Sequence, residues 1–90
     1  MGTLRYGSDS YTVANEDLVT LQFPIWEAIR EDTSFLLELN EGGRTIILPI
    51  SRGVPVSLII DTAEPLHRGD EFIDGWTAEA KRGGIIPIPS

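Results

Sequence analysis

The sequence predicts an α+β fold: one small domain over residues 1–90, with elements in the order ββαβββαβ. Three observations lead to this prediction. Short β-prone runs separated by turn residues occupy the start and the middle of the chain. Two longer segments repeat apolar residues at helical spacing. Because the strands are grouped rather than alternating singly with helices, we expect one antiparallel sheet with the two helices packed on it.

The beginning of the chain predicts a hairpin followed by a helix. Thr3–Tyr6 and Tyr11–Val13 are β-prone, and Gly7–Ser10 supplies turn residues between them. Apolar residues then recur at helical spacing at Leu18, Leu21, Ile25, Ala28 and Ile29. This pattern predicts a helix over Glu16–Glu31, with Asn15 as its N-cap.

Pro24 lies inside this helical pattern. Proline lacks a backbone N–H donor, so it kinks a helix or splits it in two. One interpretation is a single kinked helix. The other starts the helix at Pro24, a favoured first-turn residue, and makes Leu18–Phe23 extended. We prefer the single helix, because the apolar stripe stays in phase across the proline.

Three β-rich runs follow, at Ser34–Leu39, Arg44–Ile50 and Val54–Ile60. The turns between them are short, so we expect an antiparallel meander. The third run is almost wholly apolar, with Ser57 as its one interruption. A strand that is apolar on both faces should be covered on both, which here requires the other helix or a second subunit.

The last third of the chain predicts a loop, a helix and a final strand. The helix runs from Asp70, its expected cap, to Arg82, and Gly83-Gly84 ends it. Its apolar stripe consists of Phe72, Ile73, Trp76 and Ala80. The final strand, Ile85–Ile88, must lie at a sheet edge, because Pro87 cannot donate a hydrogen bond to a neighbour.

Reactive side chains are scarce. The chain has no cysteine, one histidine (His67) and one lysine (Lys81). These counts exclude a thiol nucleophile, a disulfide, a thiolate metal site and a His-rich metal cluster. Asp70, Glu71 and Asp74 lack the spacing of a calcium loop and suit the positive end of a helix dipole. We therefore predict no catalytic residue, no bound metal and no cofactor.

The charge balance is strongly acidic. Fourteen acidic residues against seven basic ones give a net charge of −7, which repels a phosphate backbone and disfavours direct nucleic-acid binding. No run reaches the roughly 18 apolar residues that a membrane span needs. The polar segment Met1–Tyr11 is unlike a signal peptide. We expect a cytoplasmic protein that does not bind a membrane.

Several segments carry a resemblance. The chain begins Met1-Gly2-Thr3-Leu4, has Leu48-Pro49 in a predicted strand, and ends Ile85-Ile86-Pro87-Ile88-Pro89. With these it resembles a family of small uncharacterised actinobacterial proteins that are often labelled automatically as ATP-dependent DNA ligases. The ligase label does not fit the residues. Nucleotidyl transfer needs a lysine in a Lys-x-Asp-Gly setting, whereas Lys81 is followed by Arg-Gly-Gly.

Apolar surface, rather than reactive groups, is what the elements leave unexplained. We therefore predict a non-enzymatic protein-interaction module that binds a protein partner as an adaptor or forms a homodimer. The expected interface residues are Phe23, Trp26, Val56, Leu58, Ile60 and Trp76. One alternative is an acidic inhibitor or nucleic-acid mimic that binds a basic protein surface. The other is a small enzyme that uses His67 with Asp70 or Glu71.

Overall fold

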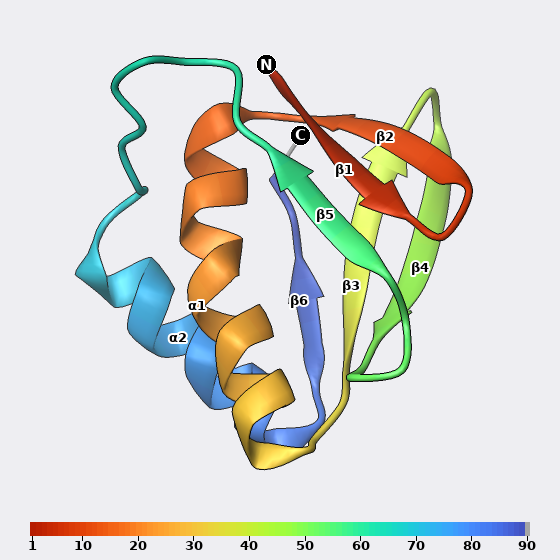
Figure 1. Cartoon of the computed structure of the whole chain (residues 1–90), viewed down its shortest axis with the longest axis vertical. Helices are drawn as coiled ribbons and strands as arrows, with labels where there is room; N and C mark the ends of the chain where they lie inside the picture. The colour runs from red at the N-terminus through yellow and green to blue at the C-terminus, as the bar shows by residue number, and fades with distance from the viewer. Residues whose placement is uncertain (90) are drawn as a thin grey trace.

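The computed structural model describes residues 1–89 and has the predicted α+β element order (Figure 1). The helices are α1 (Asn15–Glu31) and α2 (Asp70–Arg82). The strands are β1 (Gly2–Tyr6), β2 (Asp9–Val13), β3 (Phe35–Glu41), β4 (Arg44–Ile50), β5 (Val56–Ile59) and β6 (Ile85–Pro87). Neither helix within residues 1–89 is both long enough and apolar enough to cross a membrane.

The strands form two three-stranded sheets, so the expectation of one antiparallel sheet is wrong in this respect. The first sheet has the order β2-β1-β5 and is antiparallel throughout. The second has the order β4-β3-β6, in which β3 and β4 are antiparallel while β3 and β6 are parallel. The parallel pair is feasible because a long crossover through β5 and α2 separates its two strands.

The predicted meander ends after β4. The next strand, β5, leaves β4 and pairs with β1, placing Leu58 opposite Leu4. β5 occupies the edge of β1 opposite β2, and this places it in contact with α1. As a result, the first and third quarters of the chain share one sheet (Figure 1).

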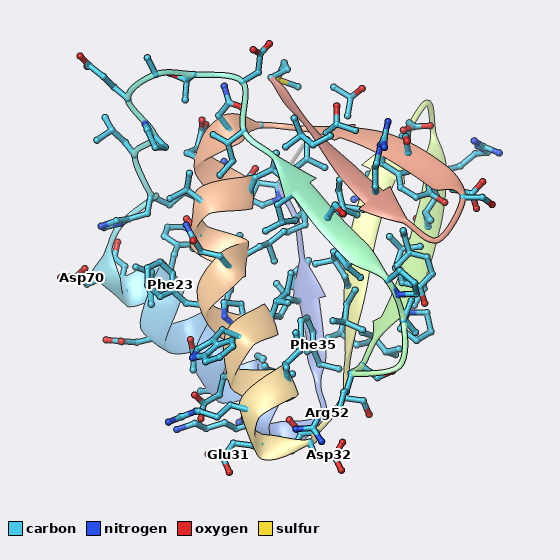
Figure 2. The ribbon with its side chains drawn as sticks, in the orientation of Figure 1. Phe23, Glu31, Asp32, Phe35, Arg52 and Asp70 are labelled. Carbon is cyan, nitrogen blue, oxygen red and sulfur yellow. The ribbon has the colours of Figure 1, made fainter. Side chains whose placement is uncertain are left out.

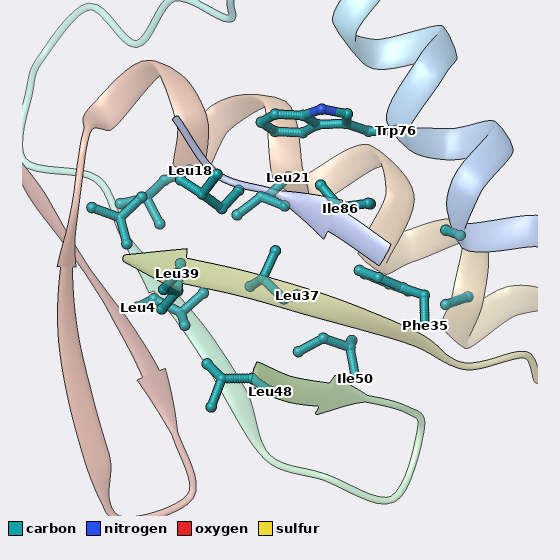
Figure 3. Packing of buried hydrophobic residues seen from close by; sticks show 14 residues of the cluster. Leu4, Leu18, Leu21, Phe35, Leu37, Leu39, Leu48, Ile50, Trp76 and Ile86 are labelled. Carbon is teal, nitrogen blue, oxygen red and sulfur yellow. The ribbon is translucent and has the colours of Figure 1, made fainter. Parts of the chain in front are cut away.

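One hydrophobic core joins both sheets and both helices. Phe35 points into the interior (Figure 2), and Figure 3 shows it in one cluster with labelled side chains from α1, α2 and the other strands. The residues labelled in the close-up are Leu4, Leu18, Leu21, Phe35, Leu37, Leu39, Leu48, Ile50, Trp76 and Ile86. Burying each such side chain contributes about 1.5–3 kcal/mol. The two helices lie side by side and close one side of this core (Figure 1).

The helix ends differ in detail from the sequence prediction. Ala14 occupies the N-cap position of α1 and Gly69 that of α2, and neither cap has a side-chain hydrogen bond. Asn15 and Asp70, the expected caps, are instead the first helical residues. Gly83 ends α2 with a left-handed φ of 72°, which confirms the predicted C-cap.

Pro24 is buried inside one continuous helix. The prediction of a single helix is confirmed, and the alternative with an extended Leu18–Phe23 is wrong. The strand predicted over Val54–Ile60 is shorter, at Val56–Ile59. Its faces alternate: Val56, Leu58 and Ile60 pack against the core, while Ser57 and Ile59 are exposed. Within residues 1–89, therefore, the outer face of β5 lacks the cover that its apolar sequence predicted.

Candidate protein-binding surface

The outer side of α1 presents two large aromatic side chains to solvent. Trp26 is 63% exposed and Phe23 is 42% exposed. Residues three apart on a helix are neighbours on its surface, so the two rings belong to one face. We call this face, together with the two grooves that flank it, the α1 surface.

The first groove lies between α1 and the edge strand β5, and we call it the β5 groove. It encloses about 360 Å³. Its lining consists of Gln22, Ile25, Trp26 and Ile29 from α1 with Val56 and Leu58 from β5. These six side chains carry no formal charge, so the groove suits an apolar ligand.

The second groove lies between the two helices, and we call it the α2 groove. It encloses about 390 Å³ and is lined by Phe23, Trp26, Glu27, Ile73, Asp74, Thr77, Ala78 and Lys81. Figure 2 shows Phe23 directed from α1 toward α2. Trp26 lines both grooves, so its indole forms the ridge that separates them.

A charged cluster lies in the α2 groove. The carboxylate of Glu27 accepts a hydrogen bond from Arg30 and lies 3.5 Å from Nζ of Lys81. The bond from Arg30 holds the pKa of Glu27 below its ordinary value, although burial of the carboxylate acts in the opposite direction. Lys81 is therefore an ion-pair partner of Glu27 in this groove.

Two tethers hold β5 in place against α1. At one end, Nη2 of Arg52 donates to the carbonyl oxygen of Ile29 at 2.9 Å, and Figure 2 shows Arg52 at the end of α1. At the other end, the backbone N–H of Asp61 donates to Oδ1 of Asn15 at 3.0 Å. The segments before and after β5 are thus both hydrogen-bonded to α1, near the two ends of the β5 groove.

The loop before α2 is anchored by a buried ion pair. The Arg68 guanidinium donates to the fully buried carboxylate of Asp17, and its backbone N–H donates to Oγ1 of Thr20 at 3.0 Å. Hydrogen bonding to Asp17 raises the pKa of Arg68. Arg68 also stacks 5.5 Å from the ring centre of Phe72. The sequence offered no local signal for this pair, because its members are 51 residues apart.

Four of the six predicted interface residues line the two grooves. The β5 groove brings together Trp26, Val56 and Leu58, and the α2 groove adds Phe23. Ile60 is half-buried just beyond β5 and lines neither groove.

Trp76 departs from the predicted interface. It is only 8% exposed and packs edge-to-face on Phe72, with ring centres 5.9 Å apart. It therefore belongs to the core rather than to an exposed surface, because α2 turns its apolar stripe inward.

Sequence reasoning missed part of this lining. Gln22, Ile25 and Ile29 were assigned to the helix or its core stripe, yet they complete the β5 groove. With Trp26 they follow the spacing of one helical face, which was the available signal. What the spacing alone did not reveal is that β5 covers only part of that face.

The residues predicted for the alternative enzymatic activity lie on the surface. His67 is exposed on the loop before α2, and Asp70 and Glu71 are exposed in the first turn of that helix. Among residues 1–89, no group of three or more His, Asp or Glu side chains is arranged to hold a metal ion.

Comparison of the chain with protein-family models, with curated proteins and with solved structures gives no match. The resemblance to the small actinobacterial proteins therefore stays a prediction.

Proposed function

We propose that the protein is a non-enzymatic interaction module and that the α1 surface is its contact face. The observation that supports this proposal is the placement of Trp26, which is 63% exposed on a ridge between two grooves. Tryptophan is among the residues most enriched at the energetic centres of protein interfaces, and Trp26 has an apolar groove on one side and a partly charged groove on the other. The occupant is either a second copy, which gives a homodimer, or another protein, which makes the chain an adaptor.

Burial of Trp26 against a partner would contribute substantially to binding. An aromatic side chain buries about 150–250 Å², and each Å² of apolar surface contributes about 25 cal/mol. Covering the exposed part of the indole thus contributes on the order of 3 kcal/mol. Phe23 and the walls of the grooves add to this, so the face has enough apolar surface to anchor a partner.

The chemistry of the grooves also supports binding over catalysis. The residues of the β5 groove offer neither a nucleophile nor a titratable acid or base. In the α2 groove, the carboxylate and the ammonium group of Glu27 and Lys81 pair with each other.

The test compares two surface variants of equal kind. Trp26→Ser removes the ridge, and Ile47→Ser removes another exposed apolar side chain, which lies on β4 and is 43% exposed. Light scattering over a range of concentrations measures self-association, and a pull-down from the native host measures partner capture. We expect a dimer or a partner that Trp26→Ser loses and Ile47→Ser keeps. A strict monomer without a partner, or binding that Trp26→Ser leaves intact, would contradict the proposal.

A further inference from the structure

We propose that the β5 groove binds an extended segment of another protein, which adds to β5 as a fourth strand of the β2-β1-β5 sheet. The segment carries apolar residues at alternate positions and basic residues at the end that lies beside Asp61. This inference rests on the proposed function and specifies its binding mode and partner.

Four strands lie at the edges of the two sheets: β2 and β5 in one, β4 and β6 in the other. Proteins protect such edges with charged side chains or prolines, because the unpaired backbone groups otherwise recruit another strand. β2 carries Asp9, β4 carries Arg44 and Pro49, and β6 carries Pro87. The sequence of β5 is Val-Ser-Leu-Ile, which has no charge and no proline. β5 is thus the edge strand whose sequence leaves it open to pairing.

The backbone N–H and C=O groups of β5 point alternately toward β1 and toward the free edge. The N–H of Gly7 donates to the carbonyl oxygen of Pro55 at 3.0 Å, so these two residues form a hydrogen-bonded pair. Such pairs recur at every second residue of an antiparallel ladder, which makes Ser57 and Ile59 the residues bonded to β1. The N–H and C=O groups of Val56 and Leu58 therefore point toward the free edge.

The floor of the β5 groove is apolar. Val56 and Leu58 line it from β5, and Ile25, Trp26 and Ile29 line it from α1. Alternate side chains of an added strand point to opposite faces of the sheet, so every second one would contact this apolar floor. Backbone hydrogen bonds then supply affinity and the floor supplies side-chain specificity, as in β-strand addition generally.

Electrostatic complementarity favours a segment of another protein over a second copy of this chain as the occupant of the β5 groove. Where β5 ends, Glu16 and Glu64 line a depression beside Asp61, which Asn15 holds in place. Glu16 already lies 3.9 Å from Arg68, whereas Asp61 and Glu64 are exposed and complement a basic residue on the incoming segment. A second copy carries the same net charge of −7 and brings its own acidic loop to the interface. A basic segment of another protein is therefore the better occupant.

The experiment uses the full chain and three synthetic octapeptides. The first has two lysines followed by three Val-Thr pairs, the second has the reverse order, and the third has glutamates in place of the lysines. Amide hydrogen exchange, followed residue by residue by NMR, is measured with each peptide up to about 1 mM, the weak end of specific recognition. This readout reports on β5 without any substitution that could unfold the protein.

We expect the lysine-first peptide to slow exchange at Val56 and Leu58 by at least about 10-fold, because their amides gain hydrogen bonds. Antiparallel addition would place its lysines beside Asp61, so it should bind more tightly than the reversed peptide. The glutamate peptide should bind at least about 10-fold more weakly. Trp26→Ser should weaken binding of the lysine-first peptide, whereas Ile47→Ser should not.

Three outcomes would overturn the inference. The first is that none of the peptides binds. The second is peptide binding that shifts the Trp26 signals while exchange at Val56 and Leu58 stays unchanged, which would leave the proposed interaction function standing with another binding mode. The third is protection of Val56 and Leu58 that rises with protein concentration in the absence of peptide, because it would identify a second copy as the occupant.

Discussion

Arg68 covers the fully buried carboxylate of Asp17, and this ion pair ties the loop before α2 to the first turns of α1. The Arg68 side chain is 26% exposed, so the pair lies at the boundary of the interior. A buried charge without its partner is costly, because it loses hydration and gains nothing in return.

Removing one member of this pair should therefore destabilise the fold. We expect Arg68→Ala to lower the free energy of unfolding by about 3 kcal/mol, since it leaves Asp17 uncompensated. Urea denaturation measures the change. Arg44→Ala is the matched control, because Arg44 is exposed and lies 3.8 Å from Glu41, and it should cost under about 1 kcal/mol. Equal losses for the two variants would contradict the assigned role of the pair.

Gly2 permits a close approach of β1 to α1. A Cβ atom at this position would lie 2.5 Å from Cδ1 of Leu18 and 2.8 Å from Oδ1 of Asn15. We expect Gly2→Ala to lower the free energy of unfolding, measured by thermal denaturation, by about 1–3 kcal/mol, because buried neighbours would have to move. Gly53→Ala is the control, since nothing lies within 4 Å of its Cβ position. A Gly2→Ala protein as stable as Gly53→Ala would show that the contact is relaxed easily.

The Glu27 cluster predicts a contribution to stability that depends on pH. The pKa of Glu27 is lowered in the folded state from an ordinary value of 4.5. Its contribution is therefore complete above that value and is lost as the pH falls through the lower, folded pKa. Glu27→Gln should flatten the decline of the urea midpoint on the acid side of pH 4.5. A decline as steep as that of the wild type would show that other carboxylates cause it.

The two tryptophans should differ in what they contribute to stability. Trp26 is exposed, so we expect Trp26→Ser to change the free energy of unfolding by no more than about 0.5 kcal/mol. Trp76 is buried, and Trp76→Ala should cost about 3–5 kcal/mol. Chemical denaturation of both variants tests this contrast. A large loss for Trp26→Ser would mean that its ring supports the fold rather than a contact with a partner.

Local patterns predicted the elements well where one segment decides its own structure. The apolar spacing from Leu18 to Ile29 predicted α1 across Pro24, and Gly83 predicted the end of α2. Patterns did less well where a distant segment competes. Asn15 has the chemistry of an N-cap, but its side-chain amide bonds to the backbone of Asp61, two residues beyond the end of β5.

The sequence predicted only part of the candidate site, because burial of a side chain depends on contacts with distant segments. Trp26 and Phe23 were singled out as large aromatic residues on the flank of a helical stripe, and both are exposed. Trp76 was singled out by the same composition and is buried, because the packing of α2 against α1 and β3 turns it inward. Residue type alone does not distinguish an anchor from a core residue.

The α+β class, the element order and the shortage of reactive side chains follow from the amino-acid sequence, because they depend on residue identity and short-range spacing. Only the tertiary structure decided that β5 pairs with β1, that the sheet divides in two, and that a groove opens between β5 and α1. The pairing of β5 with β1 and the contact of Arg68 with Asp17 both join residues that lie about 50 residues apart along the chain. Such long-range choices leave no periodic trace in a single sequence.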